Sequence, residues 1–86
     1  MAEKKIINDN NDKRLIVTQE KNSTDEYRFQ LFEFKGHKLA EIRVYTDSDR
    51  YQGPTRAGLT MRVDQLDEFI ANCEKLRAAA REEGTE

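Results

Sequence analysis

The hydrophobic pattern of this chain changes its period once, near residue 64, and that change limits the folds it can adopt. Before it, apolar and polar residues alternate within short segments, a period of two that is typical of strands with one buried face. After it, apolar residues recur every three or four positions, which is typical of an amphipathic helix. The sequence therefore predicts several strands followed by a single helix.

Four segments have strand character: Arg14–Thr18, Tyr27–Lys35, Lys38–Tyr45 and Leu59–Val63. Gly36-His37 stands where a two-residue hairpin turn would join the second strand to the third, because glycine tolerates positive φ. The polar stretch 46–57, with Gly53-Pro54 as its strongest breaker, is expected to be a long loop. The order β-β-β-β-α predicts an α+β fold with a four-stranded antiparallel sheet and one C-terminal helix.

The helix is expected from about Gln65 to Glu83, with Asp64 as its N-cap and Gly84 ending it. One helix can cover only one face of such a sheet, so one face should be buried and the other open. The helical stripe consists of Leu66, Phe69, Ile70, Cys73, Leu76 and Ala80. We expect it to pack on the more apolar sheet face, formed by Phe29, Leu31, Ala40, Ile42, Val44, Leu59, Met61 and Val63.

Length and composition indicate one small intracellular domain. Residues 1–12 are polar and expected to be a disordered tail, 13–83 the folded domain, and 84–86 a flexible end. With 86 residues, 36% hydrophobic and 37% charged, the core is small, and a dimer would supply the missing apolar contacts. No apolar run approaches the ~20 residues of a membrane span, and no signal peptide is recognisable. A single cysteine excludes an internal disulfide.

Charge is divided unevenly along the chain. The net charge is −2, but residues 13–62 hold ten Lys/Arg against seven Asp/Glu, a balance of +3. Residues 64–86 hold three basic and seven acidic residues, a balance of −4. The sheet is therefore basic and the helix acidic, which indicates a polar partner surface on the sheet.

The second sheet face is expected to carry Arg28, Gln30, Phe32, Phe34, Arg43, Tyr45 and Arg62. Rings that stack on bases, beside cations that neutralise phosphates, suit single-stranded nucleic acid. The same pattern is compatible with a structural role, in which Phe32 and Phe34 close a dimer interface or pack beneath the loop 46–57. It is also compatible with a protein-interaction module that docks a partner protein through the aromatic face or the acidic helix.

No arrangement of residues indicates an enzyme. His37 and Cys73 are the only residues of their kinds, so a zinc site, which needs three or four ligands, cannot be assembled from them. Cys73 lies on the apolar stripe, where a small buried residue is expected. Gly53 and Gly58 fit no phosphate-binding loop. We therefore expect no catalysis, no metal and no cofactor.

The segments "FKGHKLAEIRVY" and "GPTRAGLTMRVDQLDEF" resemble the positive-cofactor-four family of transcriptional coactivators. The resemblance implies a curved four-stranded antiparallel sheet, a C-terminal helix and a homodimer formed through helices and strands. It implies binding of single-stranded DNA or melted duplex with low sequence preference, in transcription or its regulation. Phe34 and Lys35 match the family's Phe-Lys, His37 stands at a basic position, and Arg43 and Arg56 match its arginines.

The chain departs from the family pattern at two positions. Thr46 replaces an aromatic residue and Ala57 replaces a lysine, which implies weaker binding or a strand path moved onto Phe32 and Tyr45. The sequence does not distinguish DNA from RNA. The candidate nucleic-acid-binding residues are Arg28, Phe32, Phe34, Lys35, His37, Arg43, Tyr45, Arg56 and Arg62.

Overall fold

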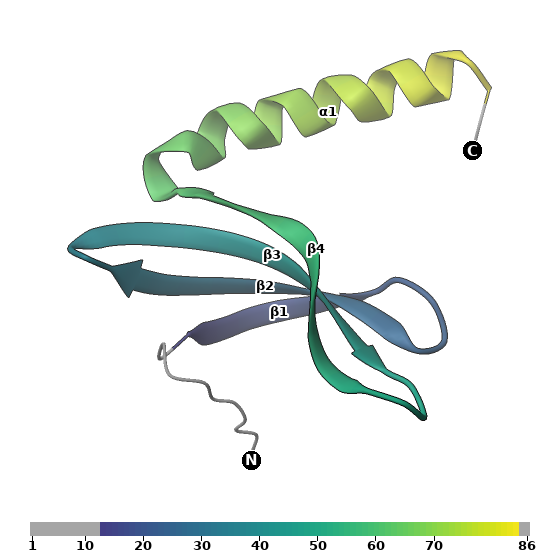
Figure 1. Ribbon diagram of the computed structural model, residues 1–86. Coiled ribbons are helices and arrows are strands. Elements are labelled where there is room, and N and C mark those ends of the chain that lie inside the picture. Colours follow the sequence, from purple (N-terminus) through teal and green to yellow (C-terminus); the bar gives the residue numbers. More distant parts are fainter. Residues whose placement is uncertain (1–12, 85–86) are drawn as a thin grey trace.

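The computed structural model, described here for residues 13–84, consists of an antiparallel sheet followed by a helix (Figure 1). The four strands lie in chain order: β1 (Arg14–Glu20), β2 (Asp25–Phe34), β3 (His37–Asp47) and β4 (Gln52–Arg62). The short 3-10 helix η1 (Val63–Gln65) leads into α1 (Leu66–Glu82). The predicted fold class is confirmed. The expectations for residues 1–12 and for the last two residues lie outside the described part of the chain.

The hairpin between β2 and β3 turns one residue earlier than the sequence predicts. Phe34 pairs with His37, so the two turn residues are Lys35 and Gly36, with φ values of 53° and 82°. Two successive positive φ angles are characteristic of a type I′ turn, whose twist matches that of the flanking strands. Lys35 therefore leaves the strand, and His37 becomes the first residue of β3.

The expected long loop 46–57 is wrong, because β4 begins at Gln52 and pairs with the far end of β3. Pro54 is tolerated there because β4 is an edge strand, on which a missing N–H leaves no ladder partner unpaired. Gly58 has a φ of 142°, and a Cβ at this position would clash with the Ile42 carbonyl oxygen. This glycine marks a close approach of β4 to β3 instead of a loop.

The assignment of residues to the two sheet faces is confirmed by the strand register. Phe29 lies opposite Ile42, and Ile42 lies opposite Leu59. We call this side the apolar face; it comprises Phe29, Leu31, Ala40, Ile42, Val44, Leu59 and Met61. The other side, called the mixed face below, carries Arg28, Gln30, Phe32, Phe34, Glu41, Arg43, Tyr45 and Arg62. Val63, expected in the last strand, belongs to η1.

The expected packing of the helix stripe on the apolar face is wrong within one chain. α1 extends from the end of β4 as a separate arm (Figure 1), with Ile70 52% and Leu76 71% exposed. The three residues of η1 connect β4 to α1. Among residues 13–84, Val44 is the only buried apolar side chain.

The ends of the helix differ in how well the sequence predicts them. Asp64 is not the N-cap of α1: it lies in η1, and Gln65 caps the helix without a side-chain hydrogen bond. Asp64 Oδ1 lies 3.5 Å from Arg62 Nε instead. Gly84 ends the helix as predicted, with a φ of 77° and its N–H donating to the Arg81 carbonyl at 3.1 Å.

Candidate nucleic-acid interface

The β2–β3 hairpin end of the mixed face combines rings with cations. Phe34 is 52% exposed and lies directly across from His37. Lys35 Nζ lies 5.3 Å from the centre of the Phe34 ring. Arg62 is brought beside them by β4, because it pairs with Leu39, which in turn pairs with Phe32. A shallow hollow of about 330 Å³, lined in part by His37 and Arg62, opens at this end.

A buried carboxylate occupies the centre of the mixed face. Glu41 is only 4% exposed, and donors from all four strand regions converge on it. Lys13 Nζ and Gln30 Nε2 donate to its Oε1 at 2.9 and 3.0 Å. Arg43 donates to Oε2 through Nη2 at 2.7 Å and Nε at 3.0 Å, and Thr60 Oγ1 donates to the same oxygen at 3.4 Å. The carboxylate therefore connects the whole sheet.

Glu41 stays ionised near neutral pH. Burial raises the pKa of its carboxyl group, but hydrogen bonds and charges from Lys13 and Arg43 outweigh burial and hold the pKa below its ordinary value. The guanidinium of Arg43 is correspondingly fixed, since its Nη1 also donates to the Arg56 carbonyl at 2.9 Å. Arg43 thus points along the face with two of its N–H groups left over for a ligand.

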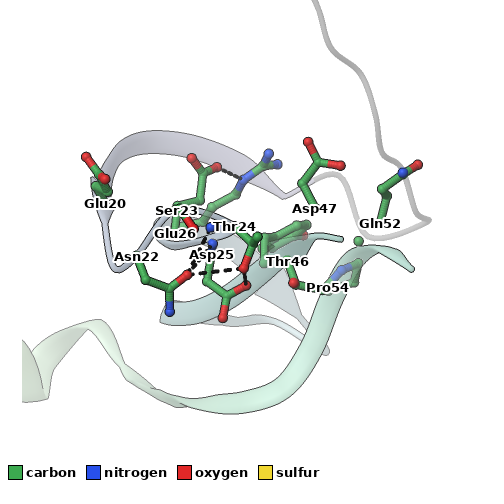
Figure 2. Close-up of a pocket in the computed structure, with 13 residues that line it drawn as sticks. Glu20, Asn22, Ser23, Thr24, Asp25, Glu26, Thr46, Asp47, Gln52 and Pro54 are labelled. Atoms are coloured by element: carbon green, nitrogen blue, oxygen red, sulfur yellow. Dashed lines mark hydrogen bonds and ion pairs between the residues drawn. The ribbon is translucent and has the colours of Figure 1, made fainter. Parts of the chain in front are cut away.

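The far end of the mixed face is acidic. The Arg28 guanidinium stacks on the Tyr45 ring, with Cζ 4.1 Å from the ring centre. Its Nε donates to Glu26 Oε2 at 2.6 Å. An open pocket of about 650 Å³ adjoins this pair, and Figure 2 shows carboxylates of Glu20, Asp25 and Asp47 around it. Negative charge at this end disfavours phosphate, although Arg28 and Tyr45 are both candidate binding residues.

Local hydrogen bonds link the residues of the loop beside the acidic pocket. Asn22 Oδ1 accepts from the backbone N–H groups of Thr24 and Asp25 at 3.0 and 2.9 Å, as the dashed lines of Figure 2 mark. Hydrogen bonds from Thr46 and Thr24 lower the pKa of Asp25. Thr46, which stands where the family has an aromatic residue, therefore contributes to this loop instead of to a stacking surface.

The structure thus divides the predicted set into groups. Phe32, Phe34, Lys35, His37 and Arg62 gather at the hairpin end, Arg43 lies at the centre, and Arg28 and Tyr45 lie at the acidic end. Arg56 is exposed on the irregular part of β4 and makes no ion pair within residues 13–84. Sequence reasoning missed Glu41 and Lys13. The available signal was an acidic residue two positions before Arg43 on an otherwise cationic strand face.

Comparison with known proteins identifies the family of this chain. The family model described as Transcriptional Coactivator p15 (PC4) matches residues 21–72, which span β2, β3, β4 and the start of α1. The chain belongs to the PC4 family. No curated protein and no solved structure gave a match.

PC4 proteins are non-enzymatic transcriptional coactivators that bind single-stranded DNA. The resemblance drawn from the sequence is confirmed by this match. Within residues 13–84, no group of three or more His, Cys, Asp or Glu side chains is arranged to hold a metal ion. No helix in the same part of the chain is long and apolar enough to cross a membrane.

Proposed function

We propose that this PC4-family chain binds single-stranded nucleic acid, and DNA in particular, on the hairpin end of its mixed face. Binding has low sequence preference. The observation that carries the proposal is Phe34, a half-exposed ring with Lys35 and His37 beside it and no helix above it. A base can stack on such a ring while neighbouring cations meet the phosphates. The proposed role is in transcription or its regulation, with residues 13–83 as the binding domain.

The proposed contacts differ in what each residue contributes. Phe34 and Phe32 supply stacking surfaces, and Lys35, His37, Arg56 and Arg62 supply donors to phosphate. Arg43, whose guanidinium is oriented by Glu41, supplies further N–H donors at the centre of the face. Arg28 and Tyr45 extend the surface toward the acidic end, where Glu26 already neutralises the arginine. Binding at that end is therefore expected to be the weaker part.

Salt dependence tests this proposal directly. Each phosphate neutralised in a single strand contributes about −0.7 to the slope of log affinity against log salt. Lys35, Arg56 and Arg62 together should give a slope of about −2 per subunit. Fluorescence anisotropy with a labelled single-stranded oligonucleotide, titrated between low and high salt, measures it. Unlabelled duplex DNA and RNA of the same sequence serve as competitors, and absence of binding at low salt would refute the proposal.

We further propose that the chain is a homodimer. With only Val44 buried among the apolar side chains of residues 13–84, one copy lacks an adequate core. The α1 stripe and the apolar face do not meet within one chain, and each leaves apolar side chains exposed: Ile70 and Leu76 on the stripe, and Leu59 on the face. A second copy covers both, because a two-fold axis brings the same surfaces of two chains together.

Sedimentation velocity at micromolar concentration should show a dimer. Leu76→Glu places a charge on the exposed stripe and should convert the protein to monomer, because an unpaired charge inside an apolar contact is strongly unfavourable. Lys75→Glu introduces the same side chain on the opposite side of α1 and should leave the dimer intact. A wild-type monomer, or equal effects of the two substitutions, would contradict this arrangement.

A further inference from the structure

Lys13 lies immediately before β1 and outside residues 21–72, to which the family match extends. Its side chain nevertheless reaches the centre of the mixed face. The ammonium group donates to Glu41 Oε1 at 2.9 Å and lies 4.9 Å from the centre of the Phe32 ring. The side chain is 24% exposed, so its charge is accessible from the surface. Lys13 is thus placed between a candidate stacking ring and a carboxylate.

The charges around Glu41 do not cancel. Two cations, Lys13 and Arg43, share one carboxylate, which leaves one net positive charge at the centre of the face. Arg43 holds Glu41 through two N–H groups and is anchored a second time on the Arg56 carbonyl. Among residues 13–84, Lys13 makes one hydrogen bond, through a flexible stem. Of the two cations, Lys13 is therefore the one that can move toward an incoming phosphate.

Lys13 also covers the ring on which a base would stack. A cation within about 6 Å of an aromatic ring centre is held by the ring quadrupole, a weak attraction at an exposed site. Phe32 is only partly exposed in this state. A base that takes the place of the ammonium group on Phe32 brings its own phosphate close by, so the displaced cation gains a stronger partner than the ring.

Building on the proposed function, we propose that Lys13 is a further nucleic-acid-binding residue of this chain. In the free protein its ammonium group caps Phe32 and pairs with Glu41. When a single strand binds, the ammonium group moves to a phosphate and leaves the ring to a base. No covalent step is involved, and Glu41 retains Arg43, Gln30 and Thr60 as hydrogen-bond donors after the exchange.

The test compares Lys13→Gln with Lys75→Gln in the full chain, by anisotropy with a single-stranded oligonucleotide over a range of salt. Lys75 is exposed on α1, away from the mixed face, so its loss removes the same charge elsewhere. Lys13→Gln should make the log–log salt slope shallower by about 0.7 and weaken binding about fivefold at 0.1 M salt. Lys75→Gln should change neither quantity. Lys13→Arg keeps the positive charge, so its salt slope should equal that of the wild-type protein.

Thermal unfolding of the three variants separates this role from a structural one. If Lys13 only stabilises Glu41, then Lys13→Gln lowers the melting temperature but leaves the salt slope of the folded protein unchanged, and the proposal is refuted. If the wild-type protein itself does not bind a single strand, the proposed function fails before this comparison is reached. A shallower slope in Lys13→Gln alone supports the proposal.

Discussion

Replacing Arg43 with alanine is expected to reduce the free energy of unfolding by about 3 kcal/mol. The reason is the carboxylate it leaves behind: Glu41 is 4% exposed and would lose both guanidinium hydrogen bonds to Oε2. Removing one partner of a buried ion pair typically costs about 3–5 kcal/mol. We place this case at the lower end because Lys13 and Gln30 still donate to Oε1. The total free energy of unfolding of a domain of this size is roughly 4–13 kcal/mol.

Urea denaturation measures this loss, and Arg62→Ala is the matched control. Arg62 also lies on the mixed face, but its ion pair with Asp64 is long and exposed, so its removal should change stability by less than about 0.5 kcal/mol. Equal stability of the two variants would show that Glu41 does not depend on Arg43. Any loss of nucleic-acid affinity in Arg43→Ala must be judged on protein shown to be folded.

Acid should weaken the same network in the wild-type protein. Because the pKa of folded Glu41 lies below its ordinary value of 4.5, the stabilisation is complete above that pH. It is lost as the pH falls through the lower pKa of the folded state, where the carboxylate becomes protonated. At neutral pH Glu41 therefore keeps its ion pairs with Lys13 and Arg43, and they are lost only in the acidic range.

The fold class and the two sheet faces could be predicted from the sequence because both depend on local periodicity. Alternation in the segments around Phe29 and Ile42 fixes which side chains share a face, and the register places these two residues opposite each other. The helix was recognisable from its stripe, and its end from Gly84. Such features require only the neighbouring residues along the chain.

The features that could not be predicted depend on contacts between distant segments. Gly53 and Pro54 are typical of a loop, yet β4 accommodates them because it is an edge strand with an irregular register. The stripe of α1 indicates that the helix has an apolar side but does not reveal which surface covers it, and within one chain Ile70 and Leu76 remain exposed. In the sequence Glu41 resembles any surface charge, and only the folded sheet brings Lys13 to it across 28 positions of sequence.

Replacing Phe34 with alanine is expected to weaken single-strand binding by about 1–3 kcal/mol, the usual range for removing one ring that stacks on a base. This corresponds to roughly a 5- to 150-fold increase in Kd. If one strand crosses both subunits of a dimer, the substitution removes two stacking rings, and the loss of binding free energy would double. The fold should remain intact, because Phe34 is 52% exposed at the hairpin end and no helix packs on its face.

Two conservative variants separate stacking from a purely apolar contribution of this ring. Phe34→Tyr keeps the aromatic surface and should bind nearly as well as the wild-type protein. Phe34→Leu keeps much of the apolar volume but has no π-face, so it should lose most of what Phe34→Ala loses. Sedimentation of the same variants tests whether Phe34 instead closes a dimer interface. If Phe34→Ala is monomeric while the wild type is dimeric, the ring contacts the second subunit, and the binding surface must lie elsewhere on the sheet.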